Sequence, residues 1–406
     1  MRMSAPRTLG INGLGRIGKL TLWYHLGHDD FDRFVVNVGR QVGTSLQSIA
    51  EYMSKDSTYG ALHRFLYGHQ GKRDVQVVDE ANGIIRAYGK EIVFLREVRN
   101  PKDIPWRDNG VVLVVDCTGK FRDPHAEADD PKGSLRGHLA AGAHAVVQSS
   151  PFKSKLKGVP TPDDAAMLIH GINHLDFDPG KHKLVSAASC TTTALAHMMR
   201  PLLARDLTRN MITAGMSTVH AVTNSQPVLD AVPGAGEKDM RKKRAAMDNI
   251  VLTSTNAASA LEQVMPEIAQ IGFMADSVRI PTASVSLIIL NVTFQTEASP
   301  DGTVSVTRND INAIYKEAAE GEACGLVRYT EEQNVSADML GEDAAVTIEG
   351  AETHTRTGFV DLRLPGGCGE HRIPLTHVKI FGWYDNEMGS YTYRLGELTA
   401  HVAKSL

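Results

Sequence analysis

The stretch TLGINGLGRIG, residues 8–18, decides the fold of this chain. A strand pattern over 8–13 runs into a GxGxxG motif, and a helical pattern over 16–26 follows. Such glycines permit a tight turn and let the backbone approach a pyrophosphate, which the N–H groups of the helix N-terminus can bind. The motif alone is a weak signal, and an ordinary turn is the alternative. Its context favours a dinucleotide site, with the expected residues Gly13, Gly15, Arg16, Ile17 and Gly18.

Outward from this stretch, strand-like and helical runs alternate. Residues 34–38, 111–116 and 145–149 are strand-like, and 135–141 are helical. Strands that alternate with helices predict an α/β fold with a parallel, doubly wound sheet.

The pattern changes after Ser189. A helical run over 191–207 and a terminal helical run over 386–406 enclose several strand-like segments. This arrangement predicts a second, mixed sheet that is antiparallel in part, built from residues 211–220, 278–280, 285–294 and 377–383.

Length and composition limit the functional classes. A chain of 406 residues with 42% hydrophobic and 22% charged residues can bury a large core and favours two domains. Its net charge of -4 gives no general attraction for nucleic acid, although small anions remain candidate ligands. The four cysteines lack CxxC spacing, and we see neither a signal peptide nor a membrane-spanning run. We therefore expect a soluble, cytoplasmic protein with no nucleic-acid or membrane partner.

The segment after the second strand bears on the choice of cofactor. An NAD site of this type places an acidic residue there to bind the ribose 2′-hydroxyl. Residues 34–40 contain no carboxylate and end in Arg40, which is expected within reach of the position that a 2′-phosphate would occupy. We expect NAD or NADP as cofactor, with NADP slightly favoured; the alternative is that Arg40 is a solvated surface charge.

Cys190 stands at the start of a predicted helix, in the segment SAASCTTTALAH over 186–197. The partial positive charge of a helix N-terminus favours a thiolate, and a neighbouring imidazolium would lower the thiol pKa further. The sequence therefore makes Cys190 a candidate nucleophile, against the alternative of a buried, inert cysteine.

Four motifs resemble the glyceraldehyde-3-phosphate dehydrogenase family in order and spacing. They are SxxSCTTxxLA at 186–196, STVHAVTxSQ at 217–226, VRIPTxxVS at 278–286 and WYDNExG at 383–389. The resemblance covers nearly the whole chain. It implies a Rossmann domain over residues 1–189, completed by the helix 386–406, an α+β catalytic domain over 190–385, and a homotetramer.

The resemblance also implies residue roles. Cys190 would attack the aldehyde to give a thiohemiacetal, and hydride transfer to NAD(P) would leave a thioester. His220 would be the base, and Asn386 would bind the nicotinamide carboxamide. Further cofactor contacts are implied for Thr118, Gly119 and Ser149.

Two anion sites follow from the same resemblance. Thr223 and Arg279 would bind the phosphate of the substrate, for which the planar donor fork of arginine is suited. For Arg279 the alternative is a surface ion pair. The pocket for inorganic phosphate would contain Ser189, Thr191 and Thr255, with Lys242 nearby.

The chain departs from the family pattern near these sites. Lys242 replaces an arginine, Asn256 a glycine and Thr193 an asparagine. Because lysine lacks the bidentate fork, the affinity for phosphate and the identity of the acyl acceptor stay open. Pro227, Val228 and Ser390 also differ from the usual residues.

Two segments, 123–134 and much of 338–376, have no clear counterpart in shorter family members. The second contains an alternating run over 359–364 followed by two glycines, which predicts a hairpin. We expect no metal site, because the spacing of Cys368, His371 and His377 matches no defined one.

The sequence thus predicts a phosphorylating aldehyde dehydrogenase that acts on a phosphorylated aldehyde, best glyceraldehyde 3-phosphate, with inorganic phosphate as acceptor. One alternative is an erythrose-4-phosphate dehydrogenase or another non-phosphorylating relative. An alternative of a different class is a non-catalytic, cofactor-binding scaffold.

Overall fold

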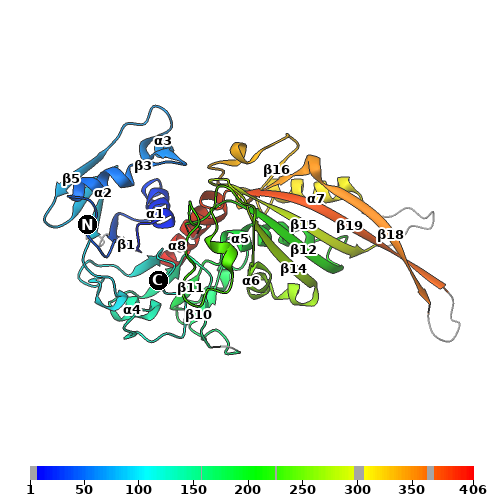
Figure 1. The fold of residues 1–406 in the computed structure, drawn as a ribbon, viewed down its shortest axis with the longest axis horizontal. Coiled ribbons are helices and arrows are strands. Elements are labelled where there is room, and N and C mark those ends of the chain that lie inside the picture. Colours follow the sequence, from blue (N-terminus) through cyan, green and yellow to red (C-terminus); the bar gives the residue numbers. More distant parts are fainter. Residues whose placement is uncertain (1–6, 157, 225, 297–305, 364–369) are drawn as a thin grey trace. The chain divides into compact units, whose positions relative to one another are not determined.

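The structure is a computed structural model that describes residues 7–156, 158–224, 226–296, 306–363 and 370–406. The chain divides into two compact units, residues 1–189 with 392–406 and residues 190–391. Figure 1 shows the elements of both. No helix in the described ranges is long and apolar enough to cross a membrane.

The first unit is built on a sheet of nine strands among the described residues, in the order β10-β11-β9-β8-β1-β2-β7-β6-β5. Adjacent strands from β10 to β7 are parallel, and only β6 and β5 are antiparallel to their neighbours. The bounds are β1 Thr8–Asn12, β2 Arg33–Asn37, β5 Val75–Asp79, β6 Ile84–Ala87, β7 Lys90–Leu95, β8 Leu113–Asp116, β9 Ala145–Gln148, β10 Ala165–Met167 and β11 Leu184–Ser186.

The strand order reverses between β1 and β8, so their carboxyl ends open a crevice at the point where ligands bind in open α/β sheets. The prediction of a doubly wound parallel sheet is confirmed. The other elements of this unit are α1 Arg16–Leu26, α2 Leu46–Met53, β3 Lys55–Asp56, β4 Gly60–Ala61, α3 Leu62–Tyr67, η1 Pro101–Asp103, α4 Leu135–Ala140, η2 His174–Asp176 and α8 Arg394–Ser405.

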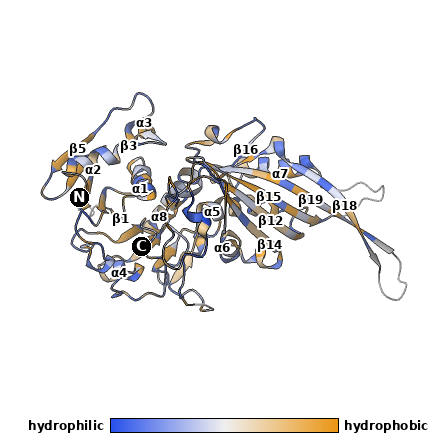
Figure 2. Cartoon of the chain, in the orientation of Figure 1, coloured by the Kyte–Doolittle hydropathy of each residue, from blue (hydrophilic) through white to orange (hydrophobic). Residues whose placement is uncertain are grey.

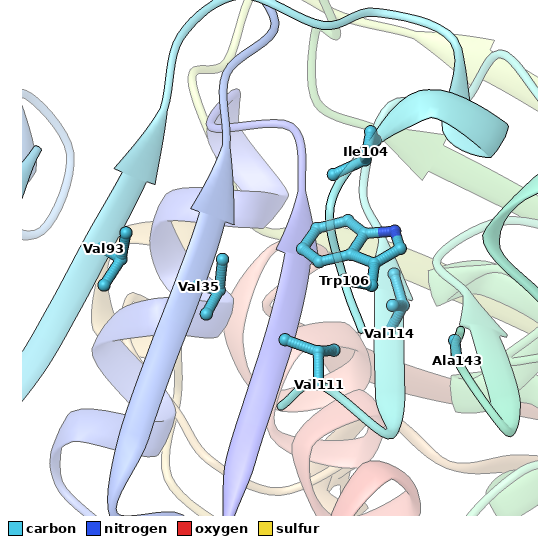
Figure 3. Packing of buried hydrophobic residues seen from close by; sticks show 7 residues of the cluster. All are labelled: Val35, Val93, Ile104, Trp106, Val111, Val114 and Ala143. Atoms are coloured by element: carbon cyan, nitrogen blue, oxygen red, sulfur yellow. The ribbon is translucent and has the colours of Figure 1, made fainter. Parts of the chain in front are cut away.

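Apolar side chains bury one part of this sheet under Trp106. The indole lies over β1, between β2 and β8, and packs with Val35, Val111 and Val114 (Figure 3). Its Nε1 donates to His138 Nδ1 over 2.9 Å, so the polar edge of the ring is also satisfied. Short β-branched strands with both faces buried are typical of a parallel sheet covered by helices.

The second unit contains a mixed sheet in the order β13-β14-β12-β15-β19-β17-β16, with β18 paired to β19, again within the described residues. The pairs β12–β14 and β16–β17 are parallel and the others are antiparallel. The predicted mixed, largely antiparallel sheet is therefore confirmed. Its strands are β12 Met211–His220, β13 Val251–Thr253, β14 Gly272–Arg279, β15 Ser286–Gln295, β16 Val327–Thr330, β17 Val346–Glu349, β18 His354–Arg363 and β19 Glu370–Tyr384.

Apolar and polar residues alternate along the central strands of this sheet (Figure 2). Ile288, Leu290 and Val292 are fully buried on the face that α5 covers. The helical elements are α5 Cys190–Leu203, η3 Met240–Lys243, α6 Ala257–Val264, η4 Pro266–Gln270, α7 Arg308–Glu320, η5 Ser336–Met339, η6 Gly350–Glu352 and the π-helix η7 Met388–Tyr393.

Several predicted boundaries shift. The helix expected over 191–207 ends at Leu203, and the terminal helix expected from 386 is a π-helix from Met388 before α8 begins at Arg394. The strand expected over 278–280 is the end of the longer β14. The hairpin expected in the second insert forms from β18 and β19, whereas the glycines at its turn and Cys368 lie outside the described residues.

Candidate active site

The glycine motif forms the turn between β1 and α1. Gly13 has φ +97°, a conformation that side chains rarely adopt. A Cβ at Gly18 would lie 1.9 Å from the carbonyl oxygen of Gly13, so the helix can approach the turn this closely only with glycine. A Cβ at Gly15 would meet nothing within 4 Å, which leaves that backbone open to a ligand. The geometry fits a pyrophosphate at the N-terminus of α1.

The Arg16 side chain has a structural partner. It pairs with buried Asp56, which also accepts from Lys19 Nζ at 2.7 Å. These two cations and the backbone N–H groups of Thr58 and Tyr59 hold the pKa of Asp56 down, at about 2, against the opposing effect of burial. Arg16 can therefore serve a cofactor through its backbone at the helix start.

A buried polar network holds the crevice between β1 and β8. Asp116 Oδ2 accepts from Asn12 Nδ2 at 2.8 Å and lies 3.1 Å from His138 Nε2. Its other oxygen accepts from the backbone N–H and the hydroxyl of Thr118. Since Trp106 donates to Nδ1 of His138, Nε2 carries the proton that Asp116 accepts. The network fixes Thr118, one of the expected cofactor residues.

A pocket of about 410 Å³ opens at this crevice. Arg40 lines it, together with Arg99 and Lys120, and no carboxylate is among its lining residues. The other residues that line it are Asn12, Gly13, Asn37, Val38, Gly39, Thr118 and Phe121. Gly119 follows Thr118 with φ +63°, and Ser149 follows β9 and donates its N–H to Asp116 O. Arg99 and Lys120 had no role in the sequence prediction, although Lys120 follows directly on the motif residue Gly119.

In the second unit, Cys190 is the first residue of α5 and His220 the last of β12. Cys190 Sγ lies 3.5 Å from His220 Nε2. His220 Nδ1 lies 2.7 Å from the carbonyl oxygen of Ala221, which can only accept, and it also contacts the Arg279 guanidinium, which can only donate. The tautomer with its proton on Nδ1 satisfies the Ala221 carbonyl. Nε2 is then an acceptor that faces the thiol, which is the orientation a general base requires.

The thiolate expected at Cys190 is not favoured in this structure. Burial raises the pKa of the Cys190 thiol, and this outweighs the lowering by Arg279 and by hydrogen bonds at the helix start. Burial and the Arg279 cation lower the pKa of His220 to about 3. Both shifts favour a neutral thiol beside a neutral imidazole, and they do not support the expected lowering of the thiol pKa by an imidazolium.

Arg279 ends β14 beside His220, its register partner on β12. Its NH1 donates to Ala221 O at 3.0 Å and lies against His220 Nδ1. Burial lowers the pKa of Arg279, and no acidic side chain in the described ranges pairs with it. The surface ion pair considered as the alternative is therefore wrong, and the cation is available to an anionic ligand.

Tyr384 holds two threonine side chains in place beneath this site. The sequence did not predict this role of Tyr384. Its hydroxyl lies 3.0 Å from Thr191 Oγ1 and 2.7 Å from Thr218 Oγ1. Nearby, Ser286 donates to Asn386 Oδ1 at 2.9 Å and accepts from Ala221 N–H, which orients the Asn386 amide. These contacts depend on the register of β12, β15 and β19, which no local motif reveals.

The other expected phosphate residues are more dispersed. Thr223 donates its N–H to Gln226, and Ser189 precedes Cys190. The Thr255 hydroxyl accepts from Ala257 N–H at the start of α6, and Lys242 lies exposed on η3. Within the described residues, neither Lys242 nor Thr255 is hydrogen-bonded to Cys190, His220 or Arg279. In the same ranges no group of histidine, cysteine and acidic residues is arranged to hold a metal ion.

The chain is similar to one family along almost its whole length. Residues 7–124 match the glyceraldehyde 3-phosphate dehydrogenase NAD binding domain, and residues 189–386 match the C-terminal domain of the same family. The chain is 33% identical to glyceraldehyde-3-phosphate dehydrogenase 1 of Bacillus cereus over 395 residues, 97% of this chain and 98% of that relative. It is 34% identical to the glyceraldehyde-3-phosphate dehydrogenase of Streptomyces coelicolor over 400 residues, 98% and 99% of the two chains. A cytosolic glyceraldehyde-3-phosphate dehydrogenase of Pisum sativum is 32% identical over 404 residues, 100% of both.

Proposed function

The chain belongs to the glyceraldehyde-3-phosphate dehydrogenase family, and from this premise we propose that it oxidises glyceraldehyde 3-phosphate through a covalent intermediate on Cys190. It is an oxidoreductase that acts on an aldehyde group with a nicotinamide cofactor and phosphate. The observation that carries the proposal is the pair Cys190 Sγ and His220 Nε2, 3.5 Å apart, with Arg279 beside the imidazole.

The first step uses Cys190 and His220. Cys190 Sγ forms a bond to the aldehyde carbon while the thiol proton passes to His220 Nε2 and from there to the former carbonyl oxygen, which gives a thiohemiacetal and returns His220 to its neutral form. In this proposal the backbone N–H of Cys190, at the start of α5, donates to the developing oxyanion. His220 then takes the hydroxyl proton during oxidation, and Cys190 is left as a thioester.

The cofactor, when bound, supplies the hydride acceptor. The open backbone at Gly15 and the cationic pocket around Arg40 are the features that fit its pyrophosphate and its ribose. Ser286 holds the Asn386 amide so that it can bind the carboxamide. Three cations and no carboxylate among the pocket residues support acceptance of NADP.

Arg279 links substrate binding to the base. Its cation contributes to the low pKa of His220. A phosphate group bound by Arg279 would offset that charge, so substrate binding raises the pKa of His220 and makes it a better proton acceptor. A phosphorylated aldehyde would thus activate its own general base.

Inorganic phosphate is the acceptor of the acyl group in this proposal, with Thr191 and Ser189 at the nucleophile as its nearest expected ligands. The exposed position of Lys242 and its lack of the arginine fork favour, as a second candidate, a relative that releases the thioester to water or acts on erythrose 4-phosphate.

The test is the rate of cofactor reduction with glyceraldehyde 3-phosphate, with NAD and NADP in parallel and with phosphate varied. We expect turnover that rises with phosphate and a higher kcat/KM for NADP, which Arg40→Ala lowers selectively. A rate independent of phosphate would reject the phosphorylating reaction, and failure of erythrose 4-phosphate to replace the substrate would reject that second candidate. No turnover with any of these substrates would favour the non-catalytic scaffold.

A further inference from the structure

A second pocket in the first unit, of about 660 Å³, has no part in the proposed reaction. It adjoins the cofactor pocket, because Arg99, Lys120 and Phe121 line both. Three segments form it, residues 99–100, 120–133 and 153–155, which follow β7, β8 and β9. It therefore lies at the carboxyl edge of a parallel sheet, where α/β proteins bind ligands.

The lining of this basic pocket is strongly cationic. Its only carboxylates among the lining residues are Asp123 and Asp130, and both accept from backbone N–H groups, Asp123 from His125 and Lys155 and Asp130 from Lys132. Six cations against two carboxylates give a local charge of +4 in a chain of net charge -4. The cations are Arg99, Lys120, Arg122, Lys132, Lys153 and Lys155.

Most of these cations have no counterion. Arg99 donates through Nε to Gly39 O. In the described parts of the chain, the side chains of the other five make neither an ion pair nor a hydrogen bond. Like charges gathered around one hollow repel each other, and an anion bound between them would relieve that repulsion.

One wall of the pocket is held in place by side chains that lie outside the segment forming that wall. It comes from the insert 123–134, whose backbone carbonyls accept from Arg136 Nε at Pro124, Lys102 Nζ at Asp129 and Asn100 Nδ2 at Asp130. Gly133, with φ +83°, closes the insert against Phe121, where a Cβ would lie 2.6 Å from the ring. Fixed carbonyls and a close glycine contact preserve the hollow without a ligand.

We propose that this basic pocket binds a small multi-anionic ligand, of the class of bisphosphates and inorganic polyphosphates, at a site separate from the cofactor and substrate sites. A ligand with two or more phosphate groups matches the excess of four positive charges better than a single phosphate does. Since Phe121 and two of the cations also line the cofactor pocket, the bound anion alters cofactor affinity.

The test is calorimetric titration of the full chain with inorganic tripolyphosphate, at low ionic strength and with the cofactor site saturated by NAD. We expect one saturable site that binds tripolyphosphate at least tenfold more tightly than orthophosphate. The double variant Lys132→Ala/Lys153→Ala should lower that affinity at least tenfold. A matched control, Lys72→Ala/Lys181→Ala, removes two exposed lysines elsewhere in the same unit and should change it less than twofold.

Two outcomes would overturn the proposal. Equal weakening in both double variants, or no saturable binding, would mean non-specific attraction of anions only. A tenfold change in the NADP-to-NAD ratio of kcat/KM in Lys132→Ala/Lys153→Ala would mean that these lysines serve the cofactor. The titration needs no turnover, so its failure is distinguishable from failure of the proposed dehydrogenase activity.

Discussion

At the scale of single residues, the reactive centre depends on one carbonyl oxygen. Ala221 O accepts from both His220 Nδ1 and Arg279 NH1. The shared acceptor brings the guanidinium close to the base and the thiol, and it favours the histidine tautomer with its proton on Nδ1. The same arrangement makes Arg279 both a substrate ligand in our proposal and a modulator of the two pKa values.

Replacement of Arg279 by glutamine should therefore have two effects. Loss of a charge-assisted hydrogen bond should lower kcat/KM for the phosphorylated aldehyde by roughly 10- to 100-fold. Alkylation of Cys190 by iodoacetamide at neutral pH should slow, because the thiol pKa rises without the cation. Arg205→Gln, at an exposed arginine in the same unit, is the control, and equal effects in both variants would contradict this role.

The buried side chain of His25 should lower the stability of the folded chain in acid. It is fully buried in α1, with neither ring nitrogen hydrogen-bonded within the described structure, and burial lowers its pKa from 6.5 to about 3. The folded state thus binds fewer protons than the unfolded state. Above pH 6.5 the folded and unfolded states bind equal numbers of protons at His25, so this residue adds no pH dependence there. Stability falls by up to about 1.4 kcal/mol per pH unit as the pH drops towards 3.

His25→Phe should remove this loss. Relative to the wild type, the variant should gain about 2 kcal/mol in free energy of unfolding between pH 7 and pH 5. Urea denaturation at both pH values measures it, with the exposed His69→Phe as control. Parallel pH dependence of the wild type and His25→Phe would show that His25 is not the source.

The sequence predicted these residues unevenly. Cys190 was recognisable because its position depends on a local helix start, whereas the direction of its pKa shift depends on burial that only the folded chain reveals. Tyr384 and Ser286 reach the site through strand register over long separations, and no nearby motif marks them.

At the scale of elements, two glycines in the turn between β1 and α1 have different roles. Gly18 allows the helix to pack on the turn, and Gly15 leaves space for a ligand. Stability and cofactor binding should therefore respond to different glycines.

Gly18→Ala should destabilise the fold by about 3 kcal/mol or more, because its Cβ would overlap the Gly13 carbonyl. Gly15→Ala should change stability by less than about 1 kcal/mol, since no atom opposes its Cβ, yet weaken cofactor binding. Thermal unfolding and cofactor titration separate the two effects. Similar melting temperatures for both variants would contradict this division.

Some of the elements that the sequence failed to predict are very short. β13 and β16 have three and four residues, too few to show a periodic pattern. In contrast, α1 carries a clear pattern and was predicted at its observed bounds. The β18–β19 hairpin was predicted from the alternation over 359–364, although both of its strands are longer than the predicted ones.

At the scale of the whole molecule, the second unit leaves large apolar side chains exposed on one face of its sheet. Met274 on β14 and Leu252 on β13 are 75% and 57% exposed, and strand register places them on one face. Exposed apolar faces of this kind mark protein interfaces. The face supports the expected homotetramer, which stays a prediction.

The double variant Met274→Lys/Leu252→Lys should therefore lower the oligomeric state measured by sedimentation, because it buries charges in the expected interface. Leu175→Lys, at a leucine 77% exposed in the first unit, should leave that state unchanged. An assembly of unchanged size in the double variant would reject this face as the interface.

The architecture as a whole was the most predictable level. Alternation of strands and helices, and its change after Ser189, indicated both sheet types, because these patterns follow from burial on both faces or on one face. The strand order, and the site contacts that depend on strand register, could not be predicted from the sequence and were seen only in the structure.

The most direct test of the central claim is a single-turnover experiment with glyceraldehyde 3-phosphate and oxidised cofactor in the absence of phosphate. We predict a burst of about one reduced nicotinamide per Cys190, together with an acyl adduct on the Cys190 peptide in mass spectrometry. Both should be absent in Cys190→Ala. A burst without an adduct on Cys190, or an undiminished burst in the variant, would contradict the account.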